Sequence, residues 1–232
     1  MIKHTIILPT YNEKENINEM IDKILANVDN VEIIVSDDNS PDKTWEIVKD
    51  RNLDNVRVIR RFKNKGVAPA IYDAIKIAKG DNIIWMDADL SMPPEMIPKM
   101  INALKKNDIA VGSRYIKGGK DKRSLVRIFT SRAVNLFANI VLNFKVLDYD
   151  SGFVAVKKIV FNKIRFNPKG HGEYCIEFLY KAGKKGYKIK EIPFKFTERT
   201  KGKSKSNQYF HSILKYGWVY GIKILSLRFK RV

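Results

Sequence analysis

Cysteine is almost absent from this sequence. Among 232 residues the only cysteine is Cys175. One cysteine cannot form a disulfide within the chain, and it cannot supply a thiolate cluster for a structural metal. The cysteine content therefore fits a reducing compartment, and we expect a cytoplasmic protein.

Long apolar runs are also missing. The first residues, Met1–His4, lead directly into the apolar segment Thr5–Leu8, without the basic, apolar and small-residue layout of a secretion signal. Near the other end, Lys215, Lys223 and Arg228 interrupt the apolar stretch. A spanning helix needs roughly 18 uninterrupted apolar residues, so the sequence predicts no segment that crosses a bilayer.

Acidic residues are scarce in the second half of the chain. Residues 1–112 carry 16 Lys and Arg against 18 Asp and Glu, a net charge of −2, whereas residues 113–232 carry 28 against 7, a net charge of +21. Such asymmetry indicates that the second half faces an anionic partner. Nucleic acid, lipid headgroups and phosphate-bearing substrates all fit, and charge alone does not choose among them.

The first half alternates short β-branched runs with helical patterns, which is typical of parallel βαβ units. The expected strands are Thr5–Leu8, Glu32–Ser36, Val56–Arg60 and Asn82–Met86. The expected helices between them are Glu15–Ala26, Thr44–Asp50 and Ala68–Lys79. The sequence therefore predicts an α/β fold with a Rossmann-like, mostly parallel sheet and helices on both faces.

The second half is less regular. It is expected to contain a helix from Pro93 through Leu104, a strand Ile109–Ser113, a mobile loop Lys117–Arg123, a turn into a strand over Asp150–Val156, a helix Glu173–Lys184, a strand Lys188–Phe196 and a loop Thr200–Asn207. We expect one domain over residues 1–206, with a nucleotide-binding half 1–112 and an acceptor half 113–206. A basic amphipathic C-terminal helix, 207–232, follows it.

Segment Ser124–Asn143 predicts a strongly amphipathic helix. Its polar arc contains Arg127, Ser131, Asn135 and Asn139, and its apolar arc contains Phe129, Ala133, Leu136, Phe137 and Ile140. Together with the basic C-terminal segment, this pattern is typical of helices that lie in a membrane interface. Two alternatives stay open: the polar arc is a solvated helix face, and Tyr209–Phe229 is an ordinary helix packed on the domain.

Three polar clusters follow expected strands: Pro9–Glu13, Asp37–Ser40 and Asp87–Asp89. In open α/β sheets, ligands bind at the carboxyl ends of the strands, so we expect these clusters to converge on one edge. The two carboxylates of Asp87 and Asp89 suit Mg²⁺ or Mn²⁺ shared with a pyrophosphate. Turn chemistry is the alternative for this pair. Asp37 and Asp38 suit a base and ribose, with a helix N-cap as the alternative.

The clusters belong to a longer series of motifs: Pro9–Glu13, Asp37–Asp42, Asp87–Pro94, Gly112–Tyr115, Ser131–Asn135, Asp150–Phe153, Glu198–Thr200 and Gly202–Lys205. In this order they resemble the motifs of family 2 glycosyltransferases, specifically the dolichyl-phosphate mannose synthase group. The resemblance covers about residues 3–207. It implies a GT-A fold with amphipathic interfacial helices.

The resemblance also implies roles for individual residues. The nucleotide sugar would be bound by Pro9, Tyr11, Glu13, Asp38, Asp87, Ala88, Arg199 and Lys205. Mg²⁺ or Mn²⁺ would be bound by Asp87, Asp89 and Ser91, and the residues that act in transfer and hold the acceptor phosphate would be Asp89, Arg114, Arg127 and Ser131. Family members often have Gln or a similar longer polar residue at the positions of Ser91 and Cys175.

The resemblance further implies a metal-dependent, inverting transfer of mannose from GDP-mannose to dolichyl or polyprenyl phosphate, which we expect at the inner face of a membrane. A phosphate monoester is largely dianionic at neutral pH, so as an acceptor it needs no general base. Candidate bases exist, at Asp148, Asp150, Glu173 and Glu177, so a hydroxyl acceptor stays open.

The sequence also leaves the donor and the partners open. UDP-glucose or another nucleotide sugar would serve the same motifs. A basic nucleic-acid-binding protein is the rival outside enzymes, but the basic half has no recognisable nucleic-acid motif, and the acidic pairs would then have no role. Family members often continue into transmembrane helices, and this sequence stops short of them. We therefore expect a peripheral enzyme, an enzyme that pairs with an integral membrane partner, or a chain cut before those helices.

Overall fold

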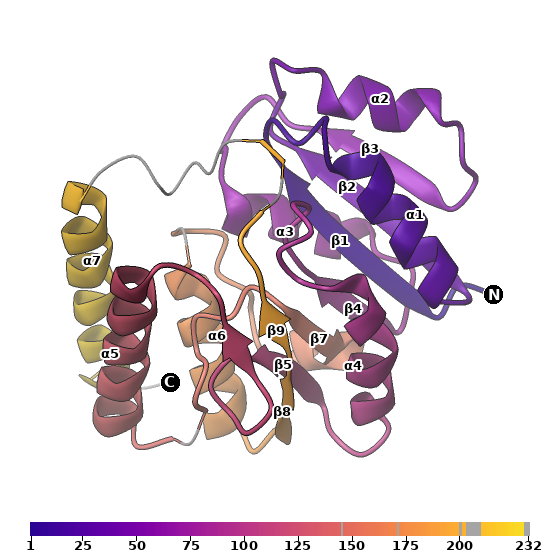
Figure 1. The fold of residues 1–232 in the computed structure, drawn as a ribbon. Coiled ribbons are helices and arrows are strands. Elements are labelled where there is room, and N and C mark those ends of the chain that lie inside the picture. The colour runs from indigo at the N-terminus through magenta and orange to yellow at the C-terminus, as the bar shows by residue number, and fades with distance from the viewer. Residues whose placement is uncertain (145, 171, 200, 203–209, 230–232) are drawn as a thin grey trace.

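The computed structural model describes residues 1–144, 146–170, 172–199, 201–202 and 210–229, and of residues 210–216 only the backbone. A seven-stranded sheet runs through the molecule in the order β3-β2-β1-β4-β7-β5-β8 (Figure 1). The strands are β1 His4–Thr10, β2 Val31–Asp37, β3 Val56–Arg60, β4 Asn82–Trp85, β5 Ile109–Ser113, β7 Val154–Lys157 and β8 Ile189–Pro193. The predicted α/β fold with a mostly parallel sheet is confirmed.

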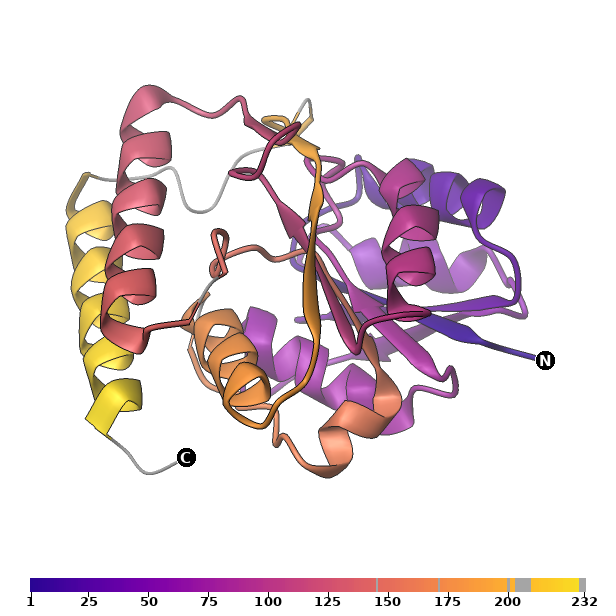
Figure 2. The same ribbon diagram turned by 90° about the horizontal axis from the view of Figure 1, so that it is seen from below.

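Helices cover both faces of this sheet (Figure 2). They are α1 Ile17–Asn27, α2 Thr44–Asp50, α3 Val67–Ile77, α4 Ile97–Leu104, α5 Leu125–Leu142, α6 Glu173–Lys184 and α7 Phe210–Phe229, with 3-10 turns at Pro94–Met96 and Lys158–Asn162. The helix predicted from Pro93 therefore begins with a 3-10 turn.

Each face of the sheet has its own hydrophobic core, because alternate side chains of a strand point to opposite faces. On β1, Ile6 and Leu8 pack with α1 and α4, whereas Ile7 packs with α3 and α6. On β4, Ile83 and Trp85 join the α3 and α6 side. Burial on both faces explains why these strands read as continuous apolar runs.

β1 through β4 are parallel, and β7 is antiparallel to both β4 and β5. The parallel part brings the carboxyl ends of β1, β2 and β4 to one edge.

Two predictions for the second half were wrong. The expected loop Lys117–Arg123 contains β6, Lys120–Asp121, which pairs in parallel with β9, Lys195–Phe196. The expected strand Lys188–Phe196 is therefore two strands. At Phe194 the chain changes partner, because its N–H donates to Ser113 on β5 while its carbonyl accepts from Lys120 beside β6.

Helices α5 and α7 lie side by side at one end of the molecule, outside α6 (Figures 1 and 2). The polar arc of α5 points into the protein, with Ser131 and Asn135 7% and 2% exposed, whereas its apolar arc points outward, with Phe129 75% and Ile140 69% exposed. The alternative of a solvated polar face was therefore wrong. For α7, Ile224 and Leu227 pack in the core while Trp218 is exposed.

Candidate active site

The clusters after β1 and β2 meet as predicted. Thr10 Oγ1 donates to Asp37 Oδ2 at 2.7 Å, and the backbone N–H of Asn12 donates to Ser40 Oγ at 3.0 Å. Asp37 also accepts from the backbone N–H of Ser40 at 2.8 Å. The carboxylate of Asp37 therefore stabilises the turn and joins the two strand ends.

Asp38 is buried at the same edge. Its carboxylate pairs with the Arg61 guanidinium and accepts from the backbone N–H of Gly66 at 2.6 Å. Burial raises the pKa of Asp38, and the Gly66 amide and Arg61 oppose that rise. Asp38 does not cap the next helix: near the start of α2, Asp42 Oδ1 accepts from the backbone N–H of Thr44 at 3.0 Å. Arg61, which no sequence motif singled out, thus positions Asp38.

Tyr11 and Pro9, which are also predicted to bind the donor, lie at the end of β1. Tyr11 is 38% exposed, and Lys65 Nζ lies 5.7 Å from the centre of its ring. Pro9 pairs in register with Ser36 of β2, so it fixes the strand end. These two residues border the same rim as Asp38.

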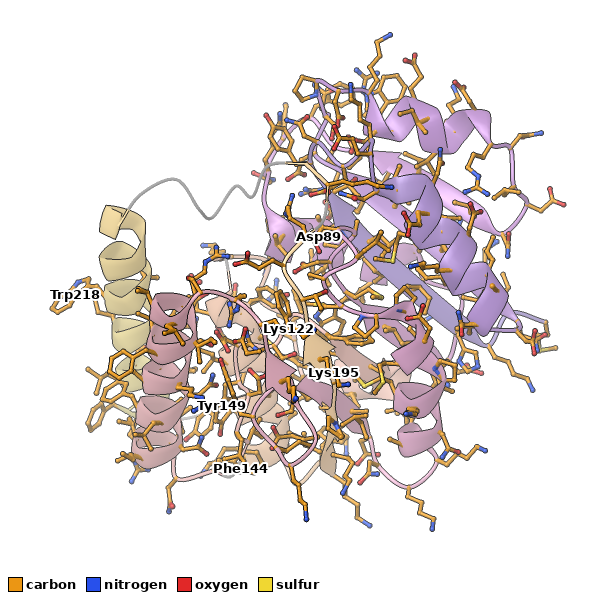
Figure 3. The ribbon with its side chains drawn as sticks, viewed as in Figure 1. Asp89, Lys122, Phe144, Tyr149, Lys195 and Trp218 are labelled. Carbon is orange, nitrogen blue, oxygen red and sulfur yellow. The ribbon has the colours of Figure 1, made fainter. Side chains whose placement is uncertain are left out.

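Asp87 and Asp89 follow β4 and share a cavity of about 520 Å³ with residues from several other elements. Burial, then the charge of Asp89, raises the pKa of Asp87 to about 7. Asp89, labelled in Figure 3, pairs with Arg199 at 2.8 Å. Arg199 also reaches Glu13 Oε1 at 3.3 Å. Three residues predicted to bind the donor, Glu13, Asp87 and Arg199, are therefore gathered around Asp89.

Ser91 and Ala88 have different surroundings. The backbone N–H of Ser91 donates to Asp89 Oδ1 at 3.0 Å, so the predicted turn chemistry is present as well. Ser91 Oγ is buried and has no hydrogen-bond partner among the described residues, and Ser91 lines the cavity. Ala88 is 3% exposed and packs in the core, and it does not line the cavity.

The donor set fits Mg²⁺ or Mn²⁺. Two carboxylates stand one residue apart, the buried hydroxyl of Ser91 beside them has no hydrogen-bond partner among the described residues, and burial and the charge of Asp89 raise the pKa of Asp87, an effect that a bound cation would oppose. Within the described residues no group of three His, Cys, Asp or Glu is placed to hold a metal. A cation bound here would therefore need oxygens from a phosphate ligand or water.

Arg114, after β5, belongs to a buried ion-pair network. Its Nη2 donates to Asp148 Oδ1 and to Asp150 Oδ1, both at 2.5 Å. Burial alone would lower the pKa of Arg114, but Asp150 and Asp148 outweigh it and hold the pKa well above its usual value. Ser131 Oγ donates to Asp150 Oδ2 at 2.9 Å, so the network also fixes the first half of α5.

Arg127 lies one turn before Ser131, and both line the cavity. Burial, then the charge of Arg123, lowers the pKa of Arg127. The cavity thus brings together predicted site residues from the ends of β4 and β5, from α5 and from the segment after β9: Asp87, Asp89, Ser91, Arg114, Arg127, Ser131 and Arg199. Five other predicted site residues do not line it: Pro9, Tyr11, Glu13, Asp38 and Ala88. Lys205 lies outside the described residues.

The match to protein families and relatives agrees with this geometry. The family model described as glycosyl transferase family 2 matches residues 5–165. The chain belongs to glycosyl transferase family 2. It is 43% identical over 213 residues to a dolichol-phosphate mannosyltransferase of Pyrococcus furiosus. The aligned region covers 88% of this chain but 59% of that protein. The chain therefore spans about three fifths of that relative.

Two further relatives are covered more fully. The chain is 31% identical to a polyprenol monophosphomannose synthase of Mycolicibacterium smegmatis, over 86% of this chain and 79% of the relative. It is 30% identical to an undecaprenyl-phosphate mannosyltransferase of Micrococcus luteus, over 86% and 85%.

Solved GT-A structures match the fold across the whole chain. Glucosyl-3-phosphoglycerate synthase of Mycobacterium tuberculosis, in complex with Mn²⁺, UDP and glucosyl-3-phosphoglycerate, has a TM-score of 0.74 at 20% identity, covering 100% of this chain and 81% of that one. The complex of the same enzyme with Mg²⁺ and UDP has a TM-score of 0.75 at 19% identity, with 100% and 81% covered. The predicted GT-A fold is confirmed, and this family 2 chain is a glycosyltransferase.

Several residues of this family 2 site were missed or misread from sequence. Asp148 and Asp150 were candidate bases, but both pair with Arg114. Glu177 pairs with Lys181 and Lys223; burial would raise its pKa, but these cations lower it to about 2. One signal in the sequence could have placed Asp148 and Asp150 at the site. Their spacing, one residue apart and close to a strand, is the same as that of Asp87 and Asp89.

Proposed function

We propose that this chain transfers mannose from GDP-mannose to dolichyl or polyprenyl phosphate at a membrane surface, with inversion and with Mg²⁺ or Mn²⁺. One observation carries the proposal: the paired carboxylates Asp87 and Asp89 share a cavity with Arg114, Arg127 and Ser131, next to a helix whose apolar face points outward. The names of the relatives support the mannosyl donor and the polyprenyl phosphate acceptor.

Asp38 and Tyr11 follow β2 and β1, and we expect these two residues to contact the nucleoside of the donor. The carboxylate of Asp38, oriented by Arg61 and Gly66, is placed to accept hydrogen bonds from a base or ribose. Tyr11 offers a partly exposed ring for contact with the nucleoside. Arg199, beside Asp89, supplies positive charge for the diphosphate.

Asp87 and Asp89, with Ser91, would hold the cation. When bound, it supplies positive charge that stabilises the departing nucleoside diphosphate. Asp87 must be ionised to bind it, so the proton that the raised pKa keeps on Asp87 leaves before or during binding.

On the acceptor side, Arg127 and Ser131 would position a phosphate monoester. An oxygen of this phosphate forms the new bond to the anomeric carbon of mannose, while the bond from that carbon to the diphosphate breaks. The phosphate is already largely dianionic, so catalysis reduces to positioning and charge neutralisation. Three of the four candidate bases, Asp148, Asp150 and Glu177, are held in ion pairs, and the fourth, Glu173, does not line the cavity. This arrangement favours a phosphate acceptor over a hydroxyl that needs a base.

The membrane explains the outward apolar face of α5. Leu125 and Phe129 near its start are 83% and 75% exposed, close in sequence to the cavity residue Arg127. By length and composition alone, with a mean hydropathy of 1.4 and 22% of it buried, α5 could also cross a bilayer. Its hydrogen bonds to Asp150 tie it to the catalytic domain instead, which favours a helix lying at the interface. We place this interface at the inner face of the membrane.

Thermal stabilisation against GDP- and UDP-sugars, with and without Mn²⁺, tests the donor. Radiolabelled transfer to a short polyprenyl phosphate, compared with transfer to a glycan hydroxyl, tests the acceptor. We expect Mn²⁺-dependent stabilisation by GDP-mannose and transfer only to the phosphate. Stabilisation by UDP-glucose alone, or transfer to the hydroxyl, would replace the proposal with the corresponding alternative.

A further inference from the structure

The cavity has two chemically different walls. One wall carries charges, from Asp87 and Asp89 after β4, Arg114 after β5 and Arg127 on α5. The other wall comes from the turn before β7, the start of α6, and α7. Asp150 in this turn pairs with Arg114 and belongs to the first wall. The other lining side chains of the second wall are neutral and include Ser151, Tyr174, Cys175 and Tyr220. We call this second surface the neutral wall.

We propose that Tyr220 of α7 contacts the transferred sugar and helps to select it. This inference rests on the proposed function, because it takes the cavity to be the site of a nucleotide sugar. A diphosphate requires cations, whereas a hexose is recognised by neutral groups that donate and accept hydrogen bonds. The neutral wall is therefore the side on which the sugar fits, and Tyr220 provides a phenolic hydroxyl there.

The neutral wall connects the carboxylate pair to Tyr220. A Cβ built on Gly152 would lie 3.8 Å from Asp87 Oδ1, and Cys175 Sγ donates to the carbonyl of Ser151 at 3.0 Å. Tyr174, next to Cys175 in α6, and Tyr220 of α7 both line the cavity on this side.

Tyr220 is held in place by its own helix. On the next turn of α7, Lys223 pairs with Glu177 of α6, and Ile224 is fully buried. Figures 1 and 2 show α7 running along the outside of α6 and α5. An ion pair whose carboxylate is 8% exposed and a buried apolar contact fix the register of α7 on the domain.

Gly172, at the start of α6, gives a second observation. Its φ of −130° is open to any residue, so backbone conformation does not require glycine. A Cβ on Gly172 would collide with Tyr220 Oη and lie 3.2 Å from Cζ, so a side chain at this position would displace the Tyr220 hydroxyl. The hydroxyl of Tyr220 therefore lies directly against a backbone position that also lines the cavity. Both residues lie outside residues 5–165, which the family model matches, so that match assigns neither of them.

The test compares binding of a nucleotide sugar with binding of its nucleoside diphosphate, by calorimetry on the full chain with Mn²⁺. For Tyr220→Phe we expect the Kd of GDP-mannose to rise about two- to tenfold, the loss of one hydrogen bond, while the Kd of GDP is unchanged. Gly172→Ala should have the same selective effect by displacing the hydroxyl. The double variant should be no worse than the single ones, because both changes act on one contact.

Trp218→Ala is the matched control, because Trp218 is on the same helix and 73% exposed, and it points away from the domain (Figure 3). It should leave both Kd values unchanged. Equal effects of Tyr220→Phe on GDP and GDP-mannose, or no effect of either cavity variant, would overturn the inference. If wild-type protein binds UDP-glucose instead, the same comparison of UDP with UDP-glucose tests Tyr220. Failure to transfer to polyprenyl phosphate would count against the proposed function alone.

Discussion

Arg199 reaches back across the site to Asp89, 110 residues earlier in the chain, and their side chains pair at 2.8 Å. The guanidinium occupies one carboxylate of the pair that we assign to the cation, and it also contacts Glu13. Arg199 thus neutralises charge at the carboxylates that we propose as metal ligands. Metal binding must compete with this ion pair, and an incoming diphosphate offers Arg199 a new partner.

Replacing Arg199 should separate metal binding from turnover. In Arg199→Ala, Asp89 loses its competing cation, so Mn²⁺ should bind more tightly in the absence of nucleotide. Turnover should fall by about a hundredfold or more, because a cation aimed at the diphosphate is lost. Mn²⁺ electron paramagnetic resonance measures free and bound metal directly. Arg199→Lys keeps the charge, so its Mn²⁺ affinity and its turnover should lie between those of the wild type and of Arg199→Ala. Unchanged Mn²⁺ affinity in Arg199→Ala would contradict the competition between Arg199 and the metal for Asp89.

The paired carboxylates should be essential for activity but not for folding. Asp89→Ala should abolish transfer, while Arg199 keeps its contact with Glu13 and the melting temperature changes by only a few degrees. Transfer assays and thermal unfolding on the same preparation measure both effects. Near-normal turnover by Asp89→Ala would remove Asp89 from the metal site.

The raised pKa of Asp87 predicts how metal binding depends on pH. Its pKa rises from the ordinary value of 3.8 to about 7, so the folded protein keeps a proton there that the unfolded chain loses. The metal-free protein should therefore lose stability as pH rises from about 4 to about 7. Mn²⁺ affinity should rise by up to about tenfold per pH unit below pH 7 and level off above it.

Titrations with Mn²⁺ at pH 5.5, 6.5 and 7.5 follow this change. Asp87→Asn removes the titrating group and should bind Mn²⁺ weakly at every pH. An affinity for wild-type protein that does not vary over this range would mean that Asp87 is ionised before the metal arrives.

Arg127 should act on the acceptor more than on the donor. Arg127→Ala should raise the KM for polyprenyl phosphate about tenfold or more, because a charge-assisted contact to phosphate is lost, with little change in donor affinity. Arg132→Ala removes the same charge from an exposed position on the same helix and should have a smaller effect. Equal losses for donor and acceptor in Arg127→Ala would indicate a structural role.

The apolar face of α5 should control membrane attachment. Phe129 and Ile140 are 75% and 69% exposed, so Phe129→Ser with Ile140→Ser should leave the melting temperature nearly unchanged. Binding to lipid vesicles should weaken by about tenfold or more, since less apolar area enters the interface. Co-sedimentation with vesicles measures this. Undiminished binding would show that another surface contacts the lipid.

Sequence patterns predicted the parts of the site that depend on local rules. The β-branched runs before Asp37 and Asp87 marked the ends of two strands. Because strands and helices alternate along this part of the chain, a parallel sheet was expected, and with it the meeting of the two acidic clusters at one edge. The helical wheel of Ser124–Asn143 identified two arcs, but not which of them faces the protein. The deciding partner of Ser131 is Asp150, which is fixed in turn by Arg114, and no periodicity encodes that pairing.

Long-range pairings account for the remaining errors. β6 and β9 are two residues long and pair over 75 positions, from Lys120 to Lys195, so neither segment has a strand pattern of its own. Arg61 was overlooked because its role depends on Asp38, 23 residues away, and on the turn at Gly66. Tyr220 belongs to a helix that the sequence indicated only as basic and amphipathic.

The central claim is that Asp87 and Asp89 hold a divalent cation against a bound diphosphate. Anomalous diffraction from crystals soaked with GDP and Mn²⁺ tests it most directly. We predict a manganese peak between the two carboxylates, in contact with diphosphate oxygens, and an Arg199 side chain that has left Asp89. GDP bound without a manganese peak at these carboxylates, or a pocket that stays empty, would contradict the account.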